Sequence, residues 1–451
     1  MKFIQKISVI LVACAVSAGV TAVAATNDFP TLTLVEARQM ALKNHPRIAA
    51  ANYRVLAAQE VTRESRAGFF PQVNLYGSAV GADSVDTRIE AGGLNNPSVF
   101  DRAAGGVGVS QLITDFGRTA NLTASSRFQA QAEGQNANAT REQVLLSVDE
   151  DYFSTLQAQS VMNVAQQTLD TRQLLLDQVT VLASNKLKSE LDVSFARVAL
   201  EEGQLLLQRA QNNFEASLAS LSTALGFREF RRFNLVEEAL PISDGTNDVS
   251  ALIDTALRDR PEILALTNER EAASRFARAQ KDSRLPTVSA IGAAGGSPMH
   301  DDRLPDDYAA GGLQVSVPVF AGGLYVARQH EAEFRAEADA ELLRALEDNV
   351  IRDVRIAWLN LNNARERLRT TEQLVNHANE AFDLEQARYN AGSSSIVELS
   401  EAQLELTSAQ IAATNARYDV LIQEANVNYQ IGGLSAATRP AEPSRKQPKH
   451  S

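Results

Sequence analysis

The chain has 451 residues, a formal net charge of −12, 22% charged residues and only 6% aromatic residues. An acidic chain is a poor partner for nucleic acid, and beyond the N-terminus no segment approaches the ~20 continuous apolar residues of a membrane helix. The low aromatic content favours Ala-rich helical packing over a large globular core. These properties argue against a nucleic-acid-binding protein and against a bundle of membrane helices.

Residues 1–24 are predicted to be an export signal. They contain Lys2 and Lys6, a short apolar run, and the A-x-A cleavage sequence that ends at Ala24. Cleavage there would shift the net charge from −12 to −14 and remove Cys14, the only cysteine, so we expect neither disulfides nor thiolate catalysis. A second interpretation stays open, because "LVAC" resembles a lipoprotein signal that would leave a lipidated Cys14 at the N-terminus.

The next elements are predicted to be a helix and two short strands. The helix covers residues 34–66, with Thr33 as its N-cap and Glu36 completing a capping box. In the first strand Val73 and Leu75 alternate with polar residues, and the segment "GGVGVSQLI" from Gly105 is its partner.

A long helical hairpin follows these strands. One helix is predicted over residues 118–183, a turn over 185–189, and a second helix up to residue 225, where Gly226 suits the position after a helix C-terminus. Small and apolar residues recur along both helices at alternating steps of three and four, as in a coiled coil. We therefore expect a long antiparallel coiled coil.

The whole unit then repeats. Pro46 aligns with Pro261 and Pro71 with Pro286 at an offset of 215, and from Val109 and Val315 onward the offset is 206. A constant register over more than a hundred residues indicates a tandem duplication. We predict a first repeat at 25–226, an inter-repeat segment at 227–250, a second repeat at 251–433, and a disordered, basic, Pro-rich tail at 434–451.

Four short strands, two in each repeat, have one apolar and one polar face, which suits a membrane barrel. Four strands cannot close a barrel, so several chains would have to share one. The side chains expected to face lipid are Val73, Leu75, Val107, Val109, Val288, Leu313, Val315 and Val317. The predicted joints between strand and long helix are Gly117, Gly322 and Gly323.

Taken together, these parts resemble the TolC family of outer-membrane efflux and secretion channels. The resemblance is carried by "LTLVEARQMALKNHPRI", "FFPQV", "VSVPVFAGG" and "ARYNAGSSSIVELSEAQLEL", and it covers essentially the whole mature chain. It implies a mainly α fold with membrane β-strands, in which a homotrimer forms a 12-stranded β-barrel continued by a coiled-coil α-barrel in the periplasm. It also implies a passive duct that works with a periplasmic adaptor and an inner-membrane pump or ABC exporter.

The resemblance further assigns roles to the hairpin tips. It implies an aperture at Glu398, Glu401, Asp192 and Tyr389, with Tyr389 and Asp192 keeping one of the polar links that close some relatives. It implies adaptor docking at Lys186, Leu187, Lys188, Ser189, Arg388, Gly392, Ser393 and Ser394. A solvated helix face is the simpler interpretation of the two glutamates.

No pattern of catalysis or metal binding accompanies these features. No two of the five histidines lie within five residues of each other, so metal-ligand spacing is absent, and no cofactor is expected. The tripeptide Asp115-Phe116-Gly117 lacks the other motifs of a kinase, and the Gly-rich stretches lack the P-loop pattern. A soluble periplasmic coiled-coil adaptor is the alternative function, and a secreted enzyme is a third.

Overall fold

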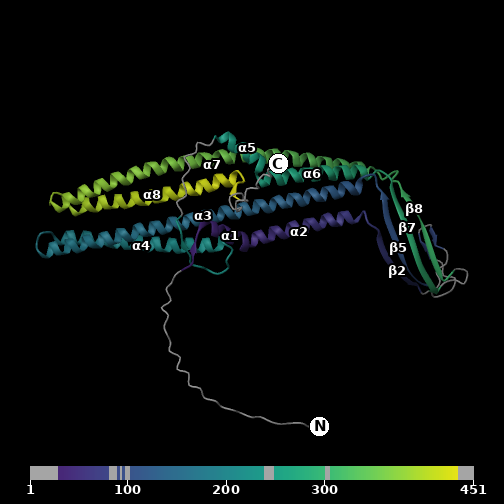
Figure 1. Cartoon of the computed structure of the whole chain (residues 1–451), viewed down its shortest axis with the longest axis horizontal. Coiled ribbons are helices and arrows are strands. Elements are labelled where there is room, and N and C mark those ends of the chain that lie inside the picture. Colours follow the sequence, from purple (N-terminus) through teal and green to yellow (C-terminus); the bar gives the residue numbers. More distant parts are fainter. Residues whose placement is uncertain are drawn as a thin grey trace, which may run out of the picture.

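The structure, a computed structural model, describes residues 29–80, 89–91, 94–96, 102–237, 248–299 and 305–434. The molecule is elongated, with a β-sheet at one end and two helical hairpins whose tips lie at the other (Figure 1). The predicted signal with Cys14 lies outside the described residues. So does the predicted tail apart from Leu434, which is buried and donates its backbone N–H to Glu142.

The duplication expected from the sequence is confirmed by the order and length of the elements. The first repeat consists of α1 (Leu34–Asn44), α2 (Pro46–Ala67), β2 (Gln72–Val80), β5 (Arg102–Thr114), α3 (Arg118–Ser184) and α4 (Glu190–Ala224). The second consists of α5 (Val249–Asp259), α6 (Pro261–Asp282), β7 (Thr287–Met299), β8 (Asp307–Ser316), α7 (Leu324–Asn390) and α8 (Ile396–Gln430). Equivalent helices have 11, 22, 67 and 35 residues in both repeats.

Two pairs of short strands complete the described elements. β3 (Ile89–Ala91) and β4 (Leu94–Asn96) pair with each other inside the longer loop of the first repeat. β1 (Thr31–Leu32) pairs in parallel with β6 (Asn234–Leu235) of the inter-repeat segment. The hydroxyl of Tyr152 on α3 lies 2.9 Å from the carbonyl oxygen of Leu32 and 2.7 Å from that of Val236. This contact ties the β1–β6 pair to the long helix.

The single helix predicted over residues 34–66 was wrong, because it is broken at His45. The residue before a proline is driven out of the α region by the proline ring, and His45 accordingly has ψ 123° and ends α1. Its Nδ1 accepts a hydrogen bond from the backbone N–H of Arg47 and so caps α2. Arg260, which precedes Pro261, makes the same break in the second repeat with ψ 125°.

A glycine packs against each of these breaks. Gly226 follows α4 with φ +83°, and a Cβ there would lie 2.9 Å from the Cα of His45 and 2.8 Å from the carbonyl carbon of Asn44. Gly432 follows α8 with φ +73°, and its Cβ would lie 3.2 Å from the Cα of Arg260. Both positions need a left-handed backbone and a close approach, so glycine suits them for two separate reasons.

The four longer strands form one antiparallel sheet in the order β2-β5-β7-β8. Each repeat contributes one hairpin, and β5 pairs with β7 where the two hairpins meet. β8 ends at Ser316, so Val317, expected to be in the strand, lies one residue beyond it. Pro318 cannot donate to a ladder and restricts Val317, and β7 begins at Thr287, opposite Ser316.

The 67-residue helices α3 and α7 are each about 100 Å long. α4 and α8 fold back along them as two antiparallel hairpins, with α3 beside α8 in the middle of the layer and α4 and α7 at its edges (Figure 1). The predicted seam is confirmed, because Val148, Ala165 and Val179 of α3 are buried, as are Ala196 and Leu200 of α4.

The close approach at Gly226 yields a stability prediction. Gly226→Val should lower the free energy of unfolding by at least about 2 kcal/mol, because a β-branched residue is strained at positive φ and its Cβ would overlap the backbone of residues 44 and 45. Gly134→Ala is the matched control, since nothing lies within 4 Å of its Cβ position in α3, and it should raise stability by about 0.5–1 kcal/mol. Thermal unfolding followed by circular dichroism measures both, and equal stabilities would contradict this account.

Candidate functional site

The sheet presents one continuous apolar face. Residues paired directly across antiparallel strands share a face, and the register places Val73 opposite Val109, Leu75 opposite Val107, and Val288 opposite Val315. The same pairing carries the face across β7 to Leu313 on β8. Seven of the eight residues expected to face lipid therefore share this face, and most are strongly exposed, Leu75 to 83% and Leu313 to 71%. The eighth, Val317, is 53% exposed beyond the end of β8.

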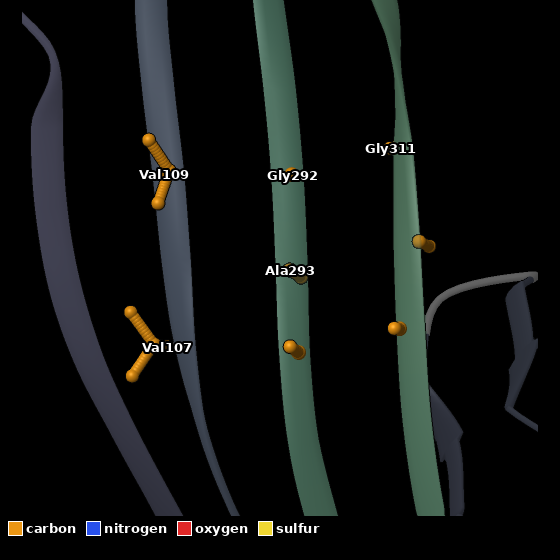
Figure 2. Close-up of a pocket in the computed structure, with 8 residues that line it drawn as sticks. Val107, Val109, Gly292, Ala293 and Gly311 are labelled. Carbon is orange, nitrogen blue, oxygen red and sulfur yellow. The ribbon is translucent and has the colours of Figure 1, made fainter.

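A shallow groove of about 500 Å³ runs over this apolar face. Figure 2 shows Val107 and Val109 on β5 beside Gly292 and Ala293 on β7 and Gly311 on β8. The groove exists because the glycines and alanines of β7 and β8 are smaller than the two valines beside them, so the surface is lower there. Its lining consists of valine, alanine and glycine only.

The opposite face of the sheet is mostly polar. Gln72, Asn74, Ser110, Ser289 and Gln314 lie on it by the same register. Two tyrosines on this face lie over glycines of the neighbouring strands. The ring of Tyr76 covers Gly108, and the hydroxyl of Tyr308 lies over Gly106 and Gly295, where any Cβ would collide with it. The sheet thus has the two-sided character of a strand layer between hydrocarbon and water.

Left-handed residues mark both joints between sheet and long helix. In the second repeat Gly322 and Gly323 have φ +60° and +83°, and apart from their chain neighbours no described residue has an atom within 4 Å of either Cβ position. In the first repeat Phe116 and Gly117 have φ +55° and +109°, and Asp115 braces the turn. Its carboxylate accepts hydrogen bonds from the backbone N–H of Gly117 and from the backbone and hydroxyl of Thr119. Both joints thus have two consecutive residues with positive φ. The first is held by hydrogen bonds to Asp115, whereas the second consists of two glycines.

At the other end of the molecule the two hairpin tips meet in a small apolar cluster. Tyr389 of α7 is only 4% exposed, and it packs with Val179 of α3, Val193 of α4 and Ile396 of α8. The Nζ of Lys188, in the first tip, lies 3.9 Å from the centroid of the Tyr389 ring, within range of a cation–π interaction. The Tyr389 hydroxyl is buried, and no described residue is its hydrogen-bond partner.

Two acidic residues assigned to the aperture, Asp192 and Glu398, lie in the first turns of α4 and α8. Both are capping-box residues. Asp192 accepts hydrogen bonds from the backbone and hydroxyl of Ser189 at 2.9 and 2.8 Å. Glu398 does the same for Ser395 and also accepts from Ser394. Within the chain, therefore, Asp192 caps α4 and does not bond to Tyr389. Glu401, one turn further along α8, is exposed.

The remaining tip residues form two C-terminal turns. Lys186 and Gly392 occupy equivalent positions with φ +56° and +76°, and the next residues, Leu187 and Ser393, donate their N–H groups back to the preceding helices. Leu187 is 70% exposed. In the second turn the Arg388 guanidinium pairs with Glu385 at 2.8 Å, and Ser394 also donates to Glu385. The aperture and docking residues assigned from the sequence thus cluster at one end of the molecule.

The sequence pattern of the family described as outer membrane efflux protein matches residues 37–227 and again residues 252–433. The chain belongs to this family. The resemblance found in the sequence is confirmed, and the chain is an outer membrane channel protein for efflux or type I secretion, with its helical tunnel in the periplasm. The alternative of a soluble periplasmic adaptor is not favoured.

Individual relatives are distant but match almost throughout. Outer membrane protein TolC of Escherichia coli is 24% identical, over 89% of this chain and 82% of TolC. The alkaline protease secretion protein AprF of Pseudomonas aeruginosa is 23% identical, over 91% of this chain and 86% of AprF. The open state of the MtrE outer membrane channel of Neisseria gonorrhoeae superposes with a TM-score of 0.73 at 20% identity, over 89% of each chain.

The family's role is transport, which is not enzymatic. Among the described residues, no group of three or more His, Cys, Asp or Glu residues could hold a metal ion. No helix in the described part of the chain is both long enough and apolar enough to cross a membrane. At mid-length of the molecule, burial raises the pKa of Asp149 against the opposing effect of its ion pair with Arg38.

Two features of the tips in this outer membrane channel were missed in the sequence. The role of Glu385 as a shared acceptor for Arg388 and Ser394 was one, although its spacing of three from Arg388 is typical of a helix-surface ion pair. The left-handed backbone of Lys186 was the other. The offset of 206 aligns Lys186 with Gly392, and this alignment is the signal that could have revealed it.

The capping box of α8 yields a pH prediction. Hydrogen bonds from the Ser395 backbone, the Ser394 hydroxyl and the Ser395 hydroxyl lower the pKa of Glu398 below its usual 4.5. A depressed folded-state pKa means that the carboxylate stabilises the helix start above pH 4.5, and that this contribution is lost as the pH falls through the folded-state value. Hydrogen exchange of residues 393–400 should therefore accelerate below pH 4.5, relative to the intrinsic rate.

Glu398→Gln is the matched variant for this experiment. Glutamine keeps the capping hydrogen bonds but does not titrate, so its exchange, corrected for the intrinsic rate, should stay constant with pH. The same acid dependence in both proteins would show that another group controls the helix start.

Proposed function

We propose that three copies of this chain form one outer membrane channel, which passively conducts solutes delivered by a periplasmic adaptor and an inner-membrane pump or ABC exporter. The observation that carries the proposal is the open four-stranded sheet with one apolar face, joined directly to 67-residue helices. Its outer strands, β2 and β8, each have one side without a partner strand among the described residues. Unpaired backbone groups cannot face hydrocarbon, so neighbouring copies have to pair these edges.

Three copies give a barrel of twelve strands, an even number within the range of outer membrane barrels. The contact between copies would be head-to-tail, with β2 of one copy beside β8 of the next, and such contacts generate a ring when the rotation between copies closes. The helices follow the same order, because α2 and α4 lie at one edge of the layer and α7 at the other (Figure 1). The apolar face of the sheet would then meet lipid, and the polar face would line the pore.

The hairpin tips would form the periplasmic mouth. The first tip offers an exposed Leu187 beside Lys186, and the second offers Arg388, Gly392 and the serines that follow it, a mixed surface suited to a protein partner. Glu401 is the carboxylate best placed to line the aperture, because Asp192 and Glu398 are engaged in capping boxes. The buried Tyr389, packed between the two hairpins, would help to hold the aperture's shape.

We propose no catalytic role. Relatives are named for protease secretion, toluene efflux and cation efflux, and such different cargoes suit a duct whose selectivity lies in the pump it serves.

The lipid-facing side of the sheet is tested with a pair of adjacent substitutions. Leu313→Arg places a charge on the apolar face and should cost about 2 kcal/mol or more per chain, with loss of the heat-resistant assembly on a gel. Gln314→Arg places the same charge on the polar face of the same strand and should leave the assembly intact. Equal behaviour of the two variants would show that the two faces do not separate lipid from water.

Docking at the tips is tested in the same paired manner. Leu187→Glu should abolish cross-linking to the adaptor in cells and abolish export, while the assembly stays in the outer membrane. Leu174→Glu, at a position that is 58% exposed on α3 but away from the tip, should retain both. Normal adaptor cross-linking by the Leu187 variant would remove the first tip from the docking surface.

A further inference from the structure

One surface at mid-length of the molecule is basic although the chain as a whole is acidic. Residues 29–54 and 226–233 hold seven Lys or Arg residues and two Glu residues, in a chain with a formal net charge of −12. One of the two acids, Glu36, is engaged in the capping box of α1. The first segment contains α1 and the start of α2, and the second follows α4 on the way to β6. Two stretches far apart in sequence therefore have the same charge bias.

The two segments lie against each other at the end of α1. The Cβ position of Gly226 is 2.8 Å from the carbonyl carbon of Asn44, so Lys43 on one side and Arg228 on the other flank a single contact. Both side chains are exposed. Neither makes an ion pair with another described residue, so both charges can meet a partner without breaking a contact within the described part of the chain.

Two further arginines extend this surface beside exposed aromatic rings. The guanidinium carbon of Arg232 lies 5.9 Å from the ring centroid of Phe29. Phe29 is 41% exposed, and Phe230, which precedes Arg231, is 50% exposed. The surface thus combines positive charge with aromatic area. We call the four exposed basic residues on it the basic patch: Lys43, Arg228, Arg231 and Arg232.

The second segment is held in place by α4. The Ser222 hydroxyl donates to the carbonyl oxygen of Arg231 at 2.9 Å and accepts from its backbone N–H at 3.2 Å. The Arg232 guanidinium also pairs with Glu215 at 2.9 Å. Because the backbone of the patch is fixed in the folded chain, little ordering would be needed for it to bind a ligand.

The second repeat shows that the fold does not require this charge. At the offset of 215, Lys43 aligns with Arg258, whose guanidinium pairs with Asp259 at 2.7 Å. Residues 34–47 contain three basic residues and one acidic residue, whereas the equivalent residues 249–262 contain two basic and three acidic ones. The same pair of helices forms in both repeats, so the positive charge belongs to the first repeat alone.

In the proposed ring the basic patch lies on the outer side of the tunnel. α1 and the β1–β6 pair pack over Val148 and Tyr152 of α3, as a second layer on one side of the helices. A second layer on the inner side would fill the duct. The layer that carries the patch therefore faces the periplasm.

The basic patch is also far from the membrane. Tyr152 lies 34 residues beyond Arg118, the first residue of α3, which is about 50 Å along the helix, and α1 lies at mid-length of the molecule (Figure 1). Lipid headgroups next to the sheet are beyond the reach of any side chain at that distance. The large anionic polymer of the periplasm is the peptidoglycan of the cell wall, whose peptide stems carry carboxylates and whose sugar rings have apolar faces.

We propose that the basic patch binds peptidoglycan. Its guanidinium and ammonium groups would pair with stem-peptide carboxylates, and the rings of Phe29 and Phe230 would pack against sugar rings. The negative charge of the whole chain opposes non-specific adsorption to this polymer, so binding has to come from a local surface.

This inference rests on the proposed function, because the ring of copies places the patch outside the tunnel. A ring of three copies would present three patches to one polymer, so that weak contacts at each patch would add up to a stable attachment. The channel would then be held to the cell wall at mid-length as well as to the membrane at the sheet.

Sedimentation with purified peptidoglycan sacculi tests the proposal on the full-length channel in phosphatidylcholine nanodiscs. The parent protein should sediment with sacculi at about 50 mM NaCl and be released at about 1 M NaCl, where the Debye length falls to about 3 Å. Sacculi whose carboxyl groups have been amidated should lose most of the bound protein. Equal binding to native and amidated sacculi would contradict the recognition of carboxylates.

The test variant removes two charges of the patch, Lys43→Gln with Arg228→Gln, and should lower the ratio of bound to unbound protein at least about fivefold. The matched control, Arg258→Gln with Arg270→Gln, removes two exposed charges from the second repeat and should bind as the parent does. Phe230→Ser should weaken binding, and Phe230→Tyr should retain it. Equal binding by the test and control variants would overturn the proposal.

Vesicles of phosphatidylcholine and phosphatidylglycerol are the second probe, because a basic and aromatic surface can also bind anionic lipid. The nanodisc-held channel should not float with these vesicles. Flotation that is lost in the Lys43 and Arg228 double variant would assign the patch to a lipid surface and overturn the assignment to peptidoglycan.

The copy number separates this inference from the proposed function. A parent that holds three copies by native mass spectrometry but does not bind sacculi would overturn the inference and leave the channel standing. A parent that remains a single chain in that measurement would overturn the ring, and with it the placement of the patch outside a tunnel.

Discussion

The unpaired edges of the sheet are the constraint on which the rest of this structure depends. Every backbone amide and carbonyl in hydrocarbon needs a partner, and strands can supply partners only to one another. We therefore propose that neighbouring copies complete the four-stranded sheet, and the helices that continue from those strands would have the same open edges. In that proposal, the apolar face of the sheet and exposed residues of α2 and α4, such as Ala50, Ala57 and Leu205, are surfaces that lipid or a neighbouring copy would cover.

The duplication also separates what the fold requires from what only one repeat uses. Asp149 of α3 is fully buried, and its carboxylate accepts two hydrogen bonds, of 2.7 and 2.6 Å, from the guanidinium of Arg38 on α1. The equivalent positions in the second repeat are Arg355, which is exposed, and Ile253, which packs against the apolar cluster of α5 and α7. The same helix arrangement thus forms with and without a buried ion pair, in keeping with the small net stability such pairs contribute.

Much of the fold could be predicted from the sequence because the duplication gave two independent views of each element. Prolines 46 and 261 fixed the register, and glycines 117 and 323 marked the helix starts within one residue. The break at His45 was missed because good helix formers such as Ala41, Leu42 and Arg47 lie on both sides of it, although Pro46 carried the signal. The end of β8 was missed because alternation in sequence continues past Ser316, where its partner strand has not yet begun.

The tips were harder to predict for a physical reason. Asp192 and Glu398 were assigned to the aperture from the family resemblance, whereas the pattern of serine followed three residues later by an acid already indicated helix capping. The contact between Lys188 and Tyr389 joins residues about two hundred positions apart, and the unsatisfied Tyr389 hydroxyl depends on how four helices meet. No local pattern encodes either of them.

The two strand–helix joints differ in their hydrogen bonds, and we expect this difference to have a mechanical consequence. Asp115 clamps the first joint with several hydrogen bonds, and Asn121 on the first turns of α3 binds Asp282 of α6 at 2.7 Å. The second joint consists of two adjacent glycines with open space around them. Torque applied at the periplasmic mouth would therefore be absorbed where α7 leaves the sheet, while α3 transmits it rigidly. Within each chain, the hairpin of α7 and α8 should therefore move relative to the sheet more easily than the hairpin of α3 and α4.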